Sequence, residues 1–266
     1  MNRIAKDVGP ARGKNGAAEL PGGKEIQFDR RATTAVARQN EPMVRHRVRI
    51  RFRKGGDLRL IGHHDLARAW ERTFRRAQIP VRMSEGFHPK PRMVFASALA
   101  MGVIGADEVL DVELAQPRTA EQLLLALAAC LPAGLSIKSL DLLPEDAPKS
   151  RVEQVTFELE VPAQRRAAVA DRLWRRRPAS VDAAETAAPQ LGTPPPSDDP
   201  PADSTSGRDP WEFVDEIELV DGILRFTSRV TPQGTTRPRE LLAWLGLTDL
   251  DEQGLYLTRT KVELLP

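Results

Sequence analysis

The sequence of 266 residues has little of what disulfides, metal–sulfur sites and membrane spans need. Its single cysteine, Cys130, excludes an intramolecular disulfide framework, a CxxC zinc site and an iron–sulfur cluster held by three cysteines. It has no run of 18 or more apolar residues, so no membrane-spanning helix and no membrane partner are expected. The first residues, MNRIAKDVGPARGKNG, lack the apolar stretch of a signal peptide. Without an export signal or disulfides, we expect a cytoplasmic protein.

Two stretches lack the apolar periodicity of folded elements. Residues 1–43 are rich in Gly, Arg, Lys, Ala and Gln. A second stretch, at about 178–210, contains TPPPSDDPPADSTSG. Because neither offers much apolar surface to bury, we predict a disordered N-terminal tail and a disordered, proline-rich insert.

Between the tail and the insert, strand and helix patterns alternate. Residues 45–54, RHRVRIRFRK, alternate arginines with mostly apolar side chains, which predicts a strand. The pattern continues as a helix, two strands, a helix and a strand over 65–78, 91–102, 107–115, 119–131 and 135–143. This β-α-β-β-α-β order is that of a ferredoxin-like domain.

The same order repeats around the insert, with strands over 152–161, 216–220, 223–230 and 255–264 and helices over 163–176 and 238–245. We therefore predict an α+β protein of two tandem ferredoxin-like domains. The first covers 44–150, and the second covers 151–266 and contains the insert. One larger α+β domain with a continuous sheet is the alternative.

Charge concentrates in the first predicted domain, although the net charge of the chain is only +2. Residues 45–92 hold 14 Lys or Arg and four acidic residues. Period-two geometry places the arginines of strand 45–54 on the face away from the helices, which is typical of a polyanion-binding surface. That face lacks the stacking aromatics of many RNA-binding sheets. Two alternatives stay open: carboxylates such as Asp111 and Glu113 or a protein partner neutralise the arginines, or the surface binds another anion.

All four histidines also fall in this domain. His63, His64 and Asp65 open the first helix, where Asp65 or His64 can cap free N–H groups. The segment SEGFHPKPR, residues 84–92, is predicted to be an extended loop that presents His88 and basic side chains. We expect this loop and His63 to lie at opposite ends of the helix. The spacing fits no usual metal site, so no metal or other cofactor is predicted.

The segments RHRVRIRFRKGGDLRLIGHHDLARAWERTFRRAQIPV and SEGFHPKPRMVFASALAMGV, followed by DEVLDVELA, resemble the radical SAM-linked protein family. The family pattern is roughly KxGxLRFLSHLDL, a helix, and then GFNPHPRLSFA. This chain departs from it with Gly62 for Ser, His64 for Leu, and His88-Pro-Lys90 for Asn-Pro-His. The resemblance implies a separately encoded radical SAM partner that carries out the radical chemistry. The matching positions are Lys54, Gly56, Leu58, Arg59, His63, Asp65, Leu66, Gly86, Phe87, Pro89, Pro91 and Arg92.

The first functional hypothesis is therefore a non-catalytic accessory protein that binds RNA for a radical SAM modification enzyme. The second is a docking module that binds the partner protein and no nucleic acid. The third is a small endoribonuclease, with His63 as candidate base and Asp65 as a further catalytic candidate. The expected RNA- or anion-binding residues are Arg47, Arg49, Arg51, Arg53, Arg59, His88, Lys90 and Arg92.

Overall fold

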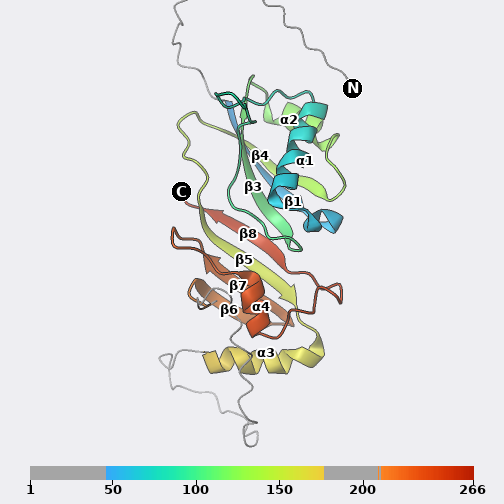
Figure 1. The fold of residues 1–266 in the computed structure, drawn as a ribbon, viewed down its shortest axis with the longest axis vertical. Coiled ribbons are helices and arrows are strands. Elements are labelled where there is room, and N and C mark those ends of the chain that lie inside the picture. The colour runs from blue at the N-terminus through green and yellow to red at the C-terminus, as the bar shows by residue number, and fades with distance from the viewer. Residues whose placement is uncertain (1–45, 177–208, 210) are drawn as a thin grey trace, which may run out of the picture. The chain divides into compact units, whose positions relative to one another are not determined.

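The computed structural model describes residues 46–176, 209 and 211–266 (Figure 1). All of these described residues fall within one compact unit. The predicted tail lies outside the described residues, as does nearly all of the predicted insert.

The elements follow the order that the sequence predicts. The N-terminal half consists of β1 (His46–Lys54), a short 3-10 helix η1 (Gly56–Leu60), α1 (His63–Arg76), β2 (Met93–Phe95), β3 (Ile104–Leu114), α2 (Ala120–Ala128) and β4 (Leu135–Leu143). The C-terminal half consists of β5 (Val152–Glu160), α3 (Ala163–Arg176), β6 (Val214–Val220), β7 (Ile223–Arg229), α4 (Pro238–Trp244) and β8 (Thr258–Leu264).

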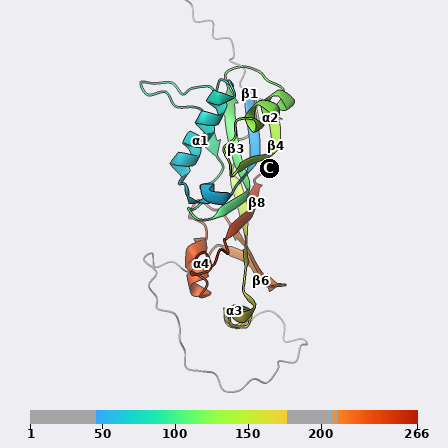
Figure 2. The ribbon, with the colours of Figure 1, turned by 90° about the vertical axis from the view of Figure 1, so that its right-hand side faces the viewer.

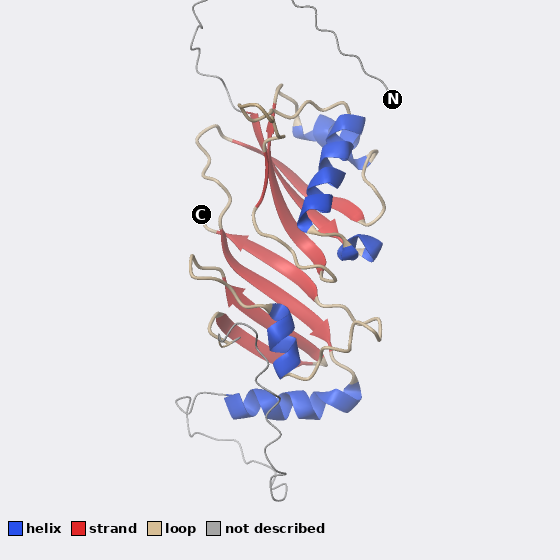
Figure 3. Ribbon diagram, viewed as in Figure 1, coloured by secondary structure: helices blue, strands red, loops and turns tan. Residues whose placement is uncertain are grey.

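The strands of the described residues form one eight-stranded sheet in the order β4-β1-β3-β8-β5-β7-β6, with β2 also paired to β3 (Figures 1 and 3). All pairs are antiparallel except β3–β8, which meet in parallel through Ile104↔Thr258 and Gly105↔Arg259. The α+β class is confirmed, and the sheet is continuous. The tandem ferredoxin-like arrangement stays a prediction.

The alternation of β1 divides the sheet into an apolar and a charged face. Val48, Ile50 and Phe52 are buried, and the Phe52 ring meets Trp70 of α1 edge to face at a centroid distance of 5.1 Å. Leu123 of α2 belongs to the same core. The two helices therefore cover the face that lies opposite the arginines of β1. Figure 2 shows α1 and α4 on the same side of the strands.

A second core lies under the C-terminal half, around the stacked rings of Phe157 and Phe226. Leu99, Val103 and Val109 of the N-terminal half also belong to this core. Their burial explains why the predicted strand 91–102 is short: only Met93–Phe95 pair with β3, and the following residues turn toward the other half.

The start of α1 differs from the prediction that Asp65 or His64 caps it. Gly62 is the N-cap, and no side chain accepts a capping hydrogen bond there. In contrast, Thr119 and Gln122 form a reciprocal capping box at the start of α2. No helix of the described residues is both long enough and apolar enough to cross a bilayer.

Candidate functional site

The arginines of β1 lie opposite carboxylates of β3. Arg49 donates from Nε to Asp111 Oδ1 at 2.8 Å and from Nη2 to Oδ2 at 2.9 Å. These hydrogen bonds raise the pKa of Arg49 above its ordinary value. Arg51 pairs with Asp107 at 2.5 Å, and Arg47 lies 3.6 Å from Asp111. The carboxylates therefore compensate three of the guanidinium groups that the sequence places on this face.

The sequence left open whether these arginines bind a polyanion or pair with carboxylates, and Arg47, Arg49 and Arg51 have carboxylates beside them. Their side chains are only 11%, 20% and 30% exposed at Arg47, Arg49 and Arg51. The cause is the strand register, which places Arg49 directly opposite Asp111. Arg53 is exposed, while Arg45 lies outside the described residues. At the centre of this face, the arginines of β1 therefore pair with carboxylates of β3, which is the alternative that the sequence left open.

Two further predicted contact residues have partners within the protein. Arg59 places its guanidinium 4.0 Å from the ring centroid of Tyr256, a cation–π contact that joins η1 to the segment before β8. Arg92 lies 3.5 Å from Glu113 of β3. His88 and Lys90, in contrast, are exposed.

The predicted loop 84–92 belongs to a hairpin held on the edge of β3. The N–H of Ser84 donates to the carbonyl of Lys90 at 2.7 Å, and the N–H of Arg92 donates to the carbonyl of Arg82 at 2.8 Å. The N–H of Glu113 then donates to the carbonyl of Arg92 at 3.0 Å. These bonds fix the base of the hairpin and leave its tip, with a fully exposed Phe87, in solvent.

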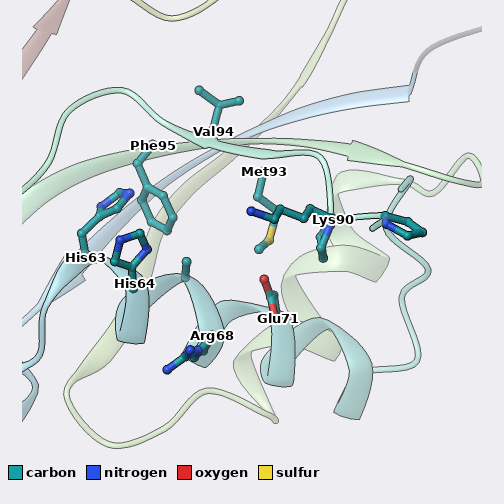
Figure 4. Close-up of a pocket in the computed structure, with 11 residues that line it drawn as sticks. His63, His64, Arg68, Glu71, Lys90, Met93, Val94 and Phe95 are labelled. Atoms are coloured by element: carbon teal, nitrogen blue, oxygen red, sulfur yellow. The ribbon is translucent and has the colours of Figure 1, made fainter. Parts of the chain in front are cut away.

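A groove of about 640 Å³ lies between α1 and this hairpin. Figure 4 shows His63 and His64 on the helix facing Phe95, with Met93 and Lys90 along the same wall, while Arg68 extends from the helix away from that wall. The expectation that the loop and the histidines lie apart is therefore wrong for His63 and His64. The hairpin folds back along α1, so that residues 89–91 line the same groove as the two histidines. His88 remains at the tip.

The groove combines rings, cations and apolar surface. The His63 ring packs edge-on against Phe95, with a centroid distance of 5.0 Å. Arg68 and Lys90 supply positive charge, and Glu71 supplies a single carboxylate. Asp65, the other catalytic candidate, lies 3.3 Å from Arg68 and is not part of the lining. No group of three or more His, Cys, Asp or Glu side chains within the described part of the chain could hold a metal ion.

Sequence analysis missed Glu71, Met93 and Phe95 as groove residues. A signal for the helical wall was present, because His64, Arg68 and Glu71 follow the i, i+4, i+7 spacing of one helix face. The other wall gave no such signal in the sequence, because only the pairing of β2 with β3 turns Phe95 toward α1.

Comparison with known proteins gives a family without an assigned activity. Residues 47–187, more than half of the chain, match the family model described as "Uncharacterized protein conserved in bacteria (DUF2344)". The chain belongs to this family. No curated protein matches this DUF2344 member. A solved structure of an unknown protein from Galdieria sulphuraria is similar to it, with 13% identity, over 84% of this chain and 99% of that chain, at a TM-score of 0.24.

Proposed function

We propose that this DUF2344 protein is an accessory protein that binds an unpaired segment of RNA in the groove between α1 and the 81–95 hairpin. The observation that carries the proposal is the composition of the groove walls. Rings of His63 and Phe95 lie beside the cations of Arg68 and Lys90 in one open groove. Proteins that bind single-stranded nucleic acid place bases on rings and phosphates near cations.

The size of the groove fits this ligand. About 640 Å³ falls within the roughly 300–1,000 Å³ typical of ligand-binding sites. Phe87, whose side chain is fully exposed at the hairpin tip, is not part of the lining but offers a further ring on the hairpin that forms one wall. Arg72 and Arg75 are exposed on α1 and extend the positive charge along the helix. An RNA strand that enters the groove therefore has phosphate partners beyond it.

The groove is a better RNA site than the arginine face of β1. Binding a phosphate to a guanidinium that already pairs with a carboxylate requires that pair to open, which cancels much of the gain. Arg49 is in this position, because both of its hydrogen bonds go to Asp111. Lys90 has its side chain exposed on the groove wall instead. Binding at Lys90 therefore breaks no ion pair of the sheet, and Arg68 has only the exposed carboxylate of Asp65 as its partner, at 3.3 Å.

The proposed partner is a separately encoded radical SAM enzyme, which would modify the RNA that this chain presents. This part of the proposal rests on the resemblance of residues 44–150 to the radical SAM-linked family. We also propose that each half is ferredoxin-like. The strand orders β4-β1-β3-β2 and β8-β5-β7-β6, taken from the continuous sheet, support this.

The test is fluorescence anisotropy with a labelled single-stranded RNA and with the same strand in a duplex. We expect the protein to bind the single strand more tightly and to lose affinity as salt rises. Lys90→Glu should weaken binding about tenfold, because it places a carboxylate where a phosphate is bound. The matched control is Arg175→Glu, an exposed charge reversal on α3. Equal affinities for Lys90→Glu and Arg175→Glu would place the RNA elsewhere.

A second candidate function is a docking module for the partner protein. Phe87, Met83 and Val94 are exposed apolar side chains of the hairpin, and such a cluster suits a protein interface. If the protein purified from cells carries nucleic acid, seen in its absorbance, the RNA function is supported. If the purified protein has no affinity for RNA, the docking function is supported. Endoribonuclease activity would require RNA cleavage that His63→Ala abolishes.

A further inference from the structure

A second cavity, of about 340 Å³, lies on the arginine face of the sheet. Its floor includes Arg47 of β1, and Asp111 and Glu113 of β3. Residues 145–150, which connect β4 to β5, form another wall. Met93 and Val94 of β2 line both this cavity and the groove, so the two spaces share one strand as a partition.

The connector between β4 and β5 is held in place over this cavity. Arg47 donates to the carbonyl oxygens of Ala147 and Pro148, the latter at 3.3 Å. At the end of the connector, the N–H of Leu265 donates to the carbonyl of Arg151 at 2.8 Å. The cavity therefore lies between the β-sheet and a tethered segment, whose lining residues Glu145 and Lys149 are exposed.

The walls contain polar atoms without partners. Seven buried side-chain atoms of the described residues have no hydrogen-bond partner, and three of them belong to residues that line this one cavity. They are Arg92 Nε, Ser150 Oγ and Glu113 Oε2, the last of which lies 3.5 Å from Arg92 Nη1 as an ion pair without a hydrogen bond. Polar atoms that have left water without gaining a partner are unfavourable, and their concentration around a cavity points to a missing ligand or to water.

The charges around the cavity define the class of ligand. Three basic and three acidic side chains line it: Arg47, Arg92, Lys149, Asp111, Glu113 and Glu145. A free anion would be repelled by three carboxylates, and a free cation would be repelled by three basic groups. A small zwitterion has no net charge and can place its two poles separately. We propose that this cavity binds a free α-amino acid, which would separate Arg92 from Glu113, now 3.5 Å apart, and place its carboxylate at Arg92 and its ammonium at Glu113.

The volume also favours such a ligand over a few waters. One water occupies about 30 Å³ in the liquid, so a cavity of about 340 Å³ exceeds what is needed to satisfy three atoms. It lies near the lower end of the range for small-molecule sites, roughly 300–1,000 Å³. Met93 and Val94 add apolar surface for the side chain of the ligand.

Isothermal titration calorimetry of the full chain tests this proposal. The probes are the proteinogenic amino acids one at a time, followed by the N-acetyl and the amide derivatives of whichever binds. We expect one or a few amino acids to bind and both derivatives to fail, because each derivative lacks one pole. Glu113→Gln should weaken binding about tenfold, since it removes the charge that pairs with the ammonium. Asp146→Asn, on the same connector but outside the lining, is the matched control and should bind normally.

Ser150→Ala is the second variant, in case Glu113→Gln does not fold. It removes one unpartnered hydroxyl and should weaken binding while its circular dichroism spectrum stays unchanged. No heat with any amino acid would overturn the proposal, and so would binding of inorganic phosphate as tight as that of the best amino acid. Retention of RNA by Glu113→Gln separates this site from the groove, because the two proposals use different side chains.

Discussion

Arg49 and Asp111 form a bidentate ion pair between β1 and β3, with nitrogen–oxygen distances of 2.8 and 2.9 Å. Asp111 also lies 3.6 Å from Arg47, so one carboxylate compensates two guanidinium groups. Its side chain is only 8% exposed, which limits the help that solvent can give if the carboxylate is lost. The charged residues on this face of the sheet therefore stabilise the fold and do not only form a surface.

Asp111→Ala should destabilise the protein by about 3 kcal/mol, because it leaves two partly buried guanidinium groups without their carboxylate. Urea denaturation followed by circular dichroism measures the loss. Asp146→Ala is the control: Asp146 is exposed on the connector between β4 and β5, and its change should cost at most about 0.5 kcal/mol. Similar losses in the two variants would show that the Asp111 pair is not an important tie between the strands.

The same variant distinguishes the groove from the sheet as the RNA site. If RNA binds in the groove, Asp111→Ala leaves affinity nearly unchanged, because the freed arginines lie on the other face of the sheet. A gain of tenfold or more would show that the arginine face binds RNA once its carboxylate is removed.

Gly105 and Glu108 give a second prediction, at the parallel junction of β3 and β8. A Cβ atom added to Gly105 would lie 2.5 Å from Glu108 Cγ, closer than real contacts allow. Glu108 is buried and pairs with the buried Arg259 of β8 through both carboxylate oxygens. Gly105→Ala should therefore cost about 3 kcal/mol through overpacking and displacement of this pair. Urea denaturation measures the cost.

Gly62→Ser is the matched control for this change. Nothing lies within 4 Å of a Cβ atom at Gly62, and its extended backbone suits a serine N-cap. The control should therefore leave stability unchanged or slightly higher. If Gly105→Ala is as stable as Gly62→Ser, the space at the junction is not needed for the ion pair.

Local patterns predicted those parts of the fold that depend on local geometry. The alternation of residues 45–54 predicted β1 nearly to the residue, because one face of the strand is buried under two helices. The strands predicted over 216–220 and 223–230 leave two residues, Asp221 and Gly222, for the turn between them. Both residues have positive φ, as a two-residue hairpin of type I′ requires, and Val220 pairs with Ile223.

Features that depend on pairing between distant segments could not be predicted in this way. The sequence placed Arg49 and Asp111 on one face of the sheet, but only the register makes them direct neighbours. The wall of the groove formed by Lys90 and Phe95 depends on the hairpin and on β2, whose three residues carry too short a pattern to recognise. The continuous sheet follows from two residue pairs between β3 and β8, which no periodicity indicates.

Phe87 gives a third prediction, on RNA affinity alone. Its side chain is fully exposed, so Phe87→Ala should leave the free energy of unfolding unchanged. If a base stacks on this ring, affinity for single-stranded RNA should fall about tenfold, as stacking contributes roughly 1–3 kcal/mol per base. Anisotropy titrations measure the change. Leu125→Ala, an exposed apolar residue of α2, is the control, and an equal effect of the two changes would contradict stacking on Phe87.

Lys54 gives the last prediction, on how stability depends on pH. It is buried beside Glu108 and Arg259, and its ammonium donates to the carbonyl of Ile61 at 2.9 Å. Burial lowers its pKa below the ordinary 10.5, the carboxylate of Glu108 opposes this shift, and the charge of Arg259 adds to it. At pH values between the pKa of Lys54 in the folded protein and its pKa in the unfolded chain, the unfolded chain therefore holds more protons at this position. Stability from Lys54 should then rise with pH across that window, which ends near 10.5.

Comparison with Lys54→Met isolates this contribution, because every other titrating group is shared. Urea denaturation at about pH 7 and about pH 9.5 gives the difference in unfolding free energy between the two proteins. We expect the difference to shift in favour of the natural protein at the higher pH, because the folded protein releases this proton at a lower pH than the unfolded chain does. Methionine keeps a similar volume and removes the charge, so packing alone would give the same difference at both pH values. A constant difference would mean that Lys54 keeps an ordinary pKa despite its burial.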